Sequence, residues 1–416
     1  MRPDCTFSEV IIMNEALREL FPSLNKFTAY LNTASIGLMP LSSVRSLSNI
    51  VSDILEFNGP VNSVDYMDDL VLNPVLNEIS KLIHASKDEV TISVQTTDAL
   101  KRVLYAIKPK RDKDNIVSVD MEFPTISCLL KSYSRSHELK LRIVKNIDGR
   151  YPIEALEQEI DDRTFAVVVS SVQWVTGYMI GIKELSKIAH EHGALIIVDA
   201  VQHVGAVDLD VRKNEVDVLA AGGEKWLLNP SVGSGILYVS RELLEKLEPY
   251  LGLLNMRPPP GTWTPWWADP NKDPWEDLEP RKDARILDFG GGMPYLLAAA
   301  LLGSLRLLNN VGMKNITRHN LRLKRILVDA ILEEGLKIIG YSDDEKLWSP
   351  ITTIQTGLSF EKEKVIWEKL SEKRISVSHR GLLGIHGIRV SPHLYNTREE
   401  IEVFLEEFLR ALGRVT

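Results

Sequence analysis

One stretch of the chain holds a carboxylate, an amide and a lysine at spacings that suit chemistry on a bound ring. Asp199 directly follows an apolar run, so we expect it at the carboxyl end of a central strand, where open α/β sheets bind ligands. A carboxylate there can keep a pyridine nitrogen protonated, and Gln202 can reach a phenolic oxygen. Lys225 follows a glycine pair that lets a ligand approach closely, and its amine can form a Schiff base. Lys225 alone would be an ordinary surface lysine, but its spacing from Asp199 favours a pyridoxal phosphate site.

The elements that must position these residues are visible in the central third of the chain. Apolar runs alternate there with amphipathic segments, which favours βαβ units around a mostly parallel sheet. Helical spacing from Ile182 to Ala189 predicts a helix that ends at Gly193. The expected strands are residues 165–170, 194–198, 216–221 and 235–239, and the last two are close enough in sequence to pair antiparallel.

The 416 residues exceed what one hydrophobic core usually organises, so we expect more than one domain. We assign residues 1–30 to an N-terminal segment, 31–295 to a large doubly wound α/β domain, and 296–416 to a smaller α+β domain. Residues 257–282 contain a proline run, four tryptophans and many charges, which predicts a long loop. Such loops are usually functional or lie at dimer contacts.

Several motifs in a consistent order carry a resemblance to a known family. The sequence VDAVQHVG at 198–205 is followed by Asp217, EKWL at 224–227 and GSGILY at 233–238. This series resembles the class V aminotransferases of pyridoxal-phosphate fold type I, which include cysteine desulfurases, kynureninases and isopenicillin-epimerase-like proteins. The likeness covers nearly the whole chain. Further matching motifs are YLNTA at 30–34, EFPT at 122–125, GIRVSP at 387–392 and YNT at 395–397.

The resemblance assigns roles to residues already singled out and adds others. It makes Lys225 the Schiff-base lysine, Asp199 the partner of the pyridine nitrogen and Gln202 the partner of the phenolic oxygen. Thr96 and Thr97 match the family's phosphate-binding region, at a strand-to-helix turn whose helix N-terminus suits an anion. An ordinary helix cap is the structural alternative for these two threonines.

Three more positions receive a role from the resemblance alone. Phe123 is expected against the face of the cofactor ring, although a phenylalanine before proline is otherwise a core residue. Gln173 matches a polar position near the phenolic side of the cofactor. Arg389 matches the arginine that binds the α-carboxylate of the substrate, where its planar fork allows bidentate pairing. A solvent-facing strand arginine is the alternative for Arg389.

Three positions depart from the family's pattern. The family commonly has a serine three residues before the lysine, a histidine just before it, and a Gly-Thr pair from the partner subunit. Gly222, Glu224 and, by our alignment, Gly291 stand in those places. All three usually help to hold the phosphate, so Thr96, Thr97 and the helix terminus would bear most of that task. A carboxylate at Glu224 repels a phosphate unless it points away or pairs with a base.

The family contains several reactions, and the sequence leaves most of them open. A cysteine desulfurase needs a mobile thiolate shortly before the arginine motif, but residues 377–386 contain no cysteine. Cys5 lies near a terminus and Cys128 in an expected helix, so persulfide chemistry of that kind is not expected. In the other reactions an amino acid displaces Lys225, whose freed amine removes the α-proton.

Of the remaining reactions we favour transamination, because that chemistry is frequent in this fold. The alternatives are a lyase (kynureninase-like or C–S lyase), an epimerase, and a non-catalytic relative that binds a partner through the tryptophan-rich loop. Retention of Lys225, Asp199, Gln202 and Arg389 argues against the last of these.

Composition restricts the partners. The net charge of -8 disfavours a nucleic-acid surface, and the longest apolar run, 293–302, is too short to span a membrane. Two cysteines give neither a disulfide framework nor a four-thiolate metal site, and no secretory signal is visible, so we expect a cytoplasmic protein without a metal. The expected small-molecule partners are an amino acid and possibly a keto acid. The resemblance also implies a homodimer.

Overall fold

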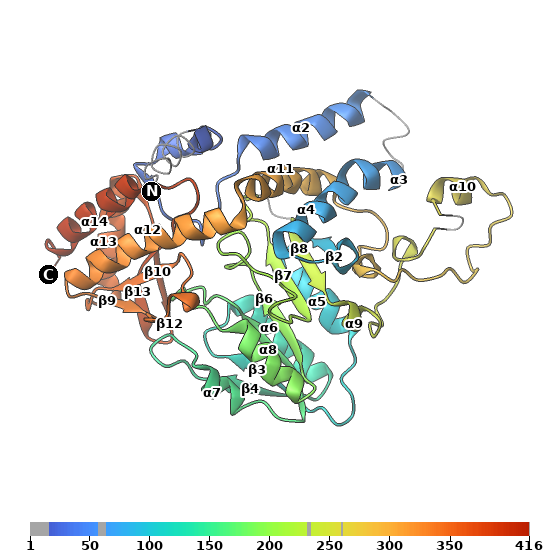
Figure 1. Ribbon diagram of the computed structural model, residues 1–416, viewed down its shortest axis with the longest axis horizontal. Helices are drawn as coiled ribbons and strands as arrows, with labels where there is room; N and C mark the ends of the chain where they lie inside the picture. Colours follow the sequence, from blue (N-terminus) through green and yellow to red (C-terminus); the bar gives the residue numbers. More distant parts are fainter. Residues whose placement is uncertain (1–15, 57–63, 231–233, 259–260, 416) are drawn as a thin grey trace, which may run out of the picture.

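The computed structural model describes residues 16–56, 64–230, 234–258 and 261–415, and its main feature is a seven-stranded sheet (Figure 1). The strand order is β2-β8-β7-β6-β5-β3-β4, in which β8 runs antiparallel to both neighbours and the pairs from β7 to β4 are parallel. The strands are β2 (Val90–Ser93), β3 (Asn115–Val119), β4 (Lys140–Val144), β5 (Thr164–Ser170), β6 (Leu195–Asp199), β7 (Val218–Gly222) and β8 (Gly235–Val239). The mostly parallel sheet and the antiparallel β7–β8 pair confirm the sequence predictions.

Helices cover both faces of this sheet because its central strands are apolar on both sides. The helices α5 (Thr96–Ala106) and α6 (Pro124–Ser136) share one buried cluster with the sheet. A second cluster joins the other face to α4 (Asn73–Ile83), α8 (Ile182–Glu191) and α11 (Tyr295–Val311). The doubly wound architecture is therefore confirmed.

A smaller antiparallel sheet lies in the C-terminal part of the chain (Figure 1, orange and red). Its order is β12-β13-β10-β9, with bounds β9 (Lys337–Ile339), β10 (Thr352–Gln355), β12 (Ser378–Leu382) and β13 (Ile385–Val390). The helices α12 (Met313–Glu333), α13 (Phe360–Glu372) and α14 (Arg398–Leu412) share its buried cluster.

The N-terminal segment is tied to this smaller unit. The strand β1 (Ala29–Tyr30) pairs in parallel with β11 (Ile375–Ser376), and Asn32 forms a bridge with Ser391. Residues 31–37 then reach the turn that carries Lys225, because the Gly37 N–H donates to the Glu224 carbonyl at 2.8 Å. This segment therefore connects the two sheets at the place where we expect the site.

The long loop after residue 256 differs from its prediction in one respect. It contains a short helix, α10 (Trp263–Ala268), in the part of the loop that extends away from the sheet (Figure 1, yellow). The helix α2 (Leu41–Glu56) lies along α11, which contains most of the apolar run singled out above. Among the described residues no single helix is long and apolar enough to cross a membrane; only α11 and α12 together pass that test, as a pair bent by 81°.

Candidate active site

Asp199 is the last residue of β6, between the parallel strands β5 and β7, as the sequence predicts. The side chain is 4% exposed, and its Oδ1 accepts the N–H of Val201 at 2.9 Å. Burial raises the pKa of Asp199 to about 6. A carboxylate in such a place is stabilised by an opposite charge, which a protonated ring nitrogen would supply.

Lys225 lies in the turn after β7, with its Nζ 5.4 Å from the ring centre of Phe123. Burial lowers the pKa of Lys225, an effect that the carboxylates of Glu224 and Asp199 partly oppose. A lysine with a lowered pKa is more often neutral, which is the form that attacks an aldehyde. Gly37 packs directly on this turn, since a Cβ there would lie 2.0 Å from the Lys225 carbonyl oxygen.

The predicted phosphate site lies beside the same turn. Thr96 and Thr97 begin α5, and the Thr96 hydroxyl accepts the N–H of Gly222 at 2.9 Å. A Cβ on Gly222 would lie 2.2 Å from the Glu224 carboxylate, so Glu224 folds back over this glycine. Two of the departures from the family are therefore linked, because Glu224 uses the space that a serine at 222 would need. Its carboxylate lies close to the end of α5, where a phosphate would bind.

The two predicted glutamines line the walls of the site. Gln202 is buried; its Nε2 donates to the Ala34 carbonyl at 3.0 Å, and its Oε1 accepts from Trp226 Nε1 at 2.7 Å. The second N–H of that amide is the group that would reach a phenolic oxygen. Gln173 is also buried, and its Nε2 donates to the Met121 carbonyl. Protein contacts thus fix the positions of both amides.

Phe123 directly precedes α6, at its N-cap position, and is 37% exposed. Its ring meets Trp174 edge to face at 5.4 Å between centroids. An aromatic ring held in this way, with a lysine amine on one side, can stack on a planar cofactor ring.

Arg389 is 1% exposed, and its guanidinium is hydrogen-bonded to Trp174 and Ser35. Its Nη1 donates to the Trp174 carbonyl at 2.5 Å, and its Nη2 donates to Ser35 Oγ at 2.7 Å. Arg380, on the neighbouring strand β12, donates to the same oxygen at 3.1 Å. Burial, and then the charge of Arg380, lowers the pKa of Arg389 to about 9. The buried Nε of Arg389 has no hydrogen-bond partner among the described residues.

Glu122 is a further buried carboxylate beside the site. It accepts hydrogen bonds from the N–H and the hydroxyl of Ser170, both at 2.6 Å. Burial raises the pKa of Glu122 to about 7. Because Glu122 directly precedes Phe123, these bonds anchor the aromatic residue to the end of β5.

The sequence predicts roles for Lys225, Asp199 and Arg389, which lie in this region of the structure, but it gives no role to Ser35, Arg380 or Glu122. Ser35 directly follows the YLNTA motif, and Glu122 is the first residue of the EFPT motif. Their positions beside or within these motifs are the only feature of the sequence that points to them. Arg380 lies in the stretch that was noted only for its lack of cysteine. Cys128 lies within α6, as expected, and is exposed.

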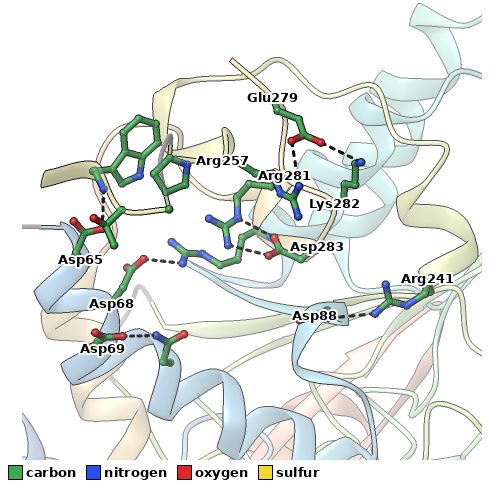
Figure 2. Close-up of a pocket in the computed structure, with 16 residues that line it drawn as sticks. Asp65, Asp68, Asp69, Asp88, Arg241, Arg257, Glu279, Arg281, Lys282 and Asp283 are labelled. Carbon is green, nitrogen blue, oxygen red and sulfur yellow. Dashed lines mark hydrogen bonds and ion pairs between the residues drawn. The ribbon is translucent and has the colours of Figure 1, made fainter. Parts of the chain in front are cut away.

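A hollow of about 840 Å³ lies next to the long loop and contains none of these residues (Figure 2). Its walls carry many charges, but most of them form ion pairs with one another. Arg285 pairs with Asp68 at 2.7 Å, and Arg281 pairs with Asp283 at 2.9 Å. The one lysine of this hollow among the described residues, Lys282, pairs with Glu279, so the candidate active site is the group around Lys225.

The arrangement around Lys225 fits pyridoxal phosphate. Lys225 would carry the aldehyde carbon, Asp199 the ring nitrogen, Gln202 the phenolic oxygen and Phe123 the ring face. The phosphate would lie at the N-terminus of α5, where Glu224 is the unfavourable neighbour. These roles follow from the family pattern and from the chemistry of each group.

Comparisons with known proteins bear on the family and the fold of this chain. The sequence profile of the Aminotransferase class-V family matches residues 71–404. The uncharacterized aminotransferase YcbU of Bacillus subtilis is 29% identical over 405 residues, which cover 94% of this chain and 96% of that protein. A probable cysteine desulfurase of Methanothermobacter thermautotrophicus is 26% identical and covers 97% of this chain and 99% of its own.

Solved structures show the same fold. The apo cysteine desulfurase of Thermococcus onnurineus superposes with a TM-score of 0.80 at 20% identity, covering 96% of this chain and 98% of its own. The complex between the cystine C–S lyase C-DES and its product cysteine persulfide gives a TM-score of 0.78 at 20% identity, covering 93% of this chain and 98% of its own.

Proposed function

We propose that this chain, which belongs to the aminotransferase class V family, is a C–S lyase for a sulfur amino acid with a second acidic group. Membership of the family makes the chain a pyridoxal-phosphate enzyme of fold type I that acts on an amino acid. The lyase was one of the alternatives left open by the sequence, whereas the frequency of reactions in the fold favoured transamination.

The observation that carries this proposal is the pair of arginines on one hairpin. Arg380 and Arg389 both donate to Ser35 Oγ, and neither forms an ion pair with a carboxylate of the described residues. One guanidinium can bind the α-carboxylate of the substrate, which leaves the other for a second anionic group. Cystine has two carboxylates, and the structurally similar C-DES is named as a cystine C–S lyase.

The lack of a cysteine in the hairpin of β12 and β13 supports the same reaction. A desulfurase transfers sulfur to its own cysteine, but the hairpin of β12 and β13 contains none, and Cys128 lies exposed on α6. Direct elimination needs no protein thiol. In this reaction the C–S bond breaks after the α-proton is removed.

The residues of the site suit that elimination. Bound pyridoxal phosphate withdraws electrons from the α-carbon of an amino acid joined to it. The Nζ of Lys225 would accept the α-proton and deliver a proton to the departing sulfur. Arg389 and Arg380 would hold the two carboxylates in a fixed orientation. Cystine and water would give pyruvate, ammonia and cysteine persulfide.

The test is a product analysis of the holoenzyme with cystine, cysteine and aspartate, each with and without a keto acid. A lyase forms pyruvate and persulfide from cystine without added keto acid. Formation of product only when a keto acid is supplied would establish an aminotransferase instead, the activity named for YcbU. Inversion of the α-carbon alone would establish an epimerase.

Variants of the two arginines test the substrate class. Arg380→Gln should raise KM for cystine about 10- to 100-fold, as expected for a lost hydrogen bond to a charge, and change KM for cysteine little. Arg389→Gln should raise KM for both. The matched control is Arg410→Gln on the exposed face of α14, which should leave both values unchanged. Equal effects of Arg380→Gln on both substrates would contradict the second-anion role.

A further inference from the structure

A buried carboxylate and two histidines meet in the smaller domain, outside the group around Lys225. Glu363 lies on α13, His379 on β12 and His386 on β13. Glu363 Oε2 is 3.1 Å from His379 Nε2 and 2.7 Å from His386 Nδ1, and the three groups place their ligand atoms within 4.8 Å of one another.

The pairing of the strands brings the two imidazoles to one face. His386 lies opposite Gly381, and His379 precedes Gly381 by two residues on the same strand. Since residues two apart on a strand share a face, both rings lie on the side that contains Glu363. The convergence is therefore built into the register of the hairpin and does not depend on a flexible loop.

Glu363 forms no ion pair with a lysine or arginine of the described residues. The carboxylate is fully buried, and among the ion pairs of the described residues it takes part only in those with the two histidines. A buried carboxylate is stabilised by a cationic partner, and a bound divalent cation would supply that charge. By contrast, His190, His192 and His84 each pair singly with an aspartate and are themselves more exposed.

Neighbouring groups hold the three side chains in place. The hydroxyl of Thr356 donates to Glu363 Oε1 at 2.7 Å, which leaves Oε2 directed at the imidazoles. Phe360 stacks on the His379 ring at 4.1 Å and meets the His386 ring edge to face at 5.7 Å. Such supporting contacts orient the ligands of metal sites in proteins.

We propose that Glu363, His379 and His386 form a binding site for a first-row divalent cation, with Zn²⁺ as the preferred ion. Two imidazole nitrogens and one carboxylate oxygen are a ligand set that zinc accepts in tetrahedral geometry. The side chain of His386 is 28% exposed, so water can enter as the fourth ligand. Binding displaces the hydrogen bonds between the imidazoles and the carboxylate and releases any proton they share to solvent.

The ion would join α13 to the hairpin of β12 and β13. Arg380 directly follows His379, and Arg389 lies on the same strand as His386. The site is therefore structural: it fixes the hairpin that presents the two arginines and takes no part in the reaction.

The experiment measures metal on the full-length protein after removal of loosely bound ions by a chelator. Titration with zinc chloride, followed by mass spectrometry of metal content, should give about one zinc per chain and a higher melting temperature. His386→Gln should lose the stoichiometric zinc, and Thr356→Val should bind it about 10-fold more weakly. His192→Gln, which changes an exposed histidine paired with Asp162, is the matched control and should bind as wild type.

Two results would overturn the proposal. One is a folded wild-type protein that binds less than stoichiometric zinc and shows no thermal shift. The other is stoichiometric binding that survives in His386→Gln, because the zinc would then lie elsewhere. Metal content and melting temperature do not depend on the reaction catalysed, so this test stands independently of the lyase assay.

Discussion

At the scale of single residues, Lys225 carries the largest functional consequence. We assign its amine as the attachment point of the cofactor and as the proton acceptor, and burial lowers its pKa. We expect Lys225→Ala to reduce activity by at least about 10²- to 10⁴-fold, the range attributed to positioned acid–base groups. Borohydride reduction and peptide mapping should place the cofactor on Lys225 in the wild type. Lys213→Ala, at an exposed lysine paired with Asp210, should keep both activity and adduct. An adduct on another lysine would disprove the assignment.

Asp199 should make cofactor binding depend on pH. Burial raises its pKa to about 6, so the carboxyl group is largely neutral below that value and gives no charge to a protonated ring nitrogen. The affinity of the apoprotein for pyridoxal phosphate should therefore rise as the pH increases through about 6. Fluorescence titration of wild type and Asp199→Asn separates this effect from titration of the phosphate, because the variant keeps only the latter.

The raised pKa of Asp199 has the opposite effect on the stability of the apoprotein. The folded pKa of Asp199 lies above its unfolded value, so the folded apoprotein binds more protons between about pH 4 and 6. The free energy of unfolding contributed by this residue consequently falls as the pH rises through that window. Cofactor binding, which favours the ionised form, should reverse the loss. Equal pH profiles for wild type and Asp199→Asn would contradict both expectations.

Glu224 is expected to weaken phosphate binding. Its carboxylate folds over Gly222 beside the end of α5, and two negative charges near a helix N-terminus compete for the same backbone dipoles. Glu224→Gln should tighten pyridoxal phosphate binding about 5-fold, which corresponds to about 1 kcal/mol of removed repulsion. Pyridoxal without its phosphate should bind equally to both forms. Glu245→Gln, at an exposed position, is the control, and weaker binding by Glu224→Gln would show that the carboxylate supports the site.

At the scale of elements, the N-terminal segment packs closely against the turn that carries Lys225. A Cβ on Gly37 would meet the Lys225 carbonyl oxygen at 2.0 Å, which is backbone and cannot rotate away. Gly37→Ala should therefore destabilise the protein by about 1–3 kcal/mol and lower cofactor loading. Gly181→Ala, where a Cβ meets nothing within 4 Å, is the matched control. An unchanged melting temperature and unchanged cofactor loading in Gly37→Ala would show that the N-terminal segment can move away from the turn of Lys225 without loss of stability.

Elements with a strong local pattern could be predicted from the sequence. The strand before Asp199 and the turn before Lys225 were found because alternation of apolar runs and helices is local information. The joint contact of Arg380 and Arg389 with Ser35 was not, because Ser35 lies 345 residues from Arg380 and no periodicity links them. Tertiary pairing of β1 with β11 brings them together.

The short helix α10 was missed for a related reason. Its first N–H groups, those of Trp263 and Thr264, donate to the carboxylate of Asp65 at 3.2 and 3.1 Å. The cap is thus supplied by a residue almost two hundred positions earlier, whereas sequence reasoning looks for a cap just before the helix. Prolines and charges around the helix made the segment resemble a loop.

At the scale of the whole molecule, the long loop presents aromatic side chains to solvent. Trp275 is 90% exposed and Trp267 is 53% exposed, and Tyr250 before the loop is fully exposed. Side chains of this kind are enriched at protein interfaces. We propose that this loop lies at the seam of a homodimer, consistent with the expectation for enzymes of this fold.

Light scattering after size-exclusion chromatography tests that arrangement directly. The expected mass is twice the 46.9 kDa of one chain. Trp275→Lys should shift the equilibrium toward monomer, while Ile147→Lys, at an exposed apolar residue on another loop, should not. With the site at a dimer seam, dissociation should also weaken pyridoxal phosphate binding, so affinity should rise with protein concentration over the range in which dimers form. A wild-type monomer that binds the cofactor at full occupancy would contradict this arrangement. It would show that one chain holds the phosphate without a partner, and that the N-terminus of α5 with Thr96 and Thr97 is sufficient despite the nearby carboxylate of Glu224.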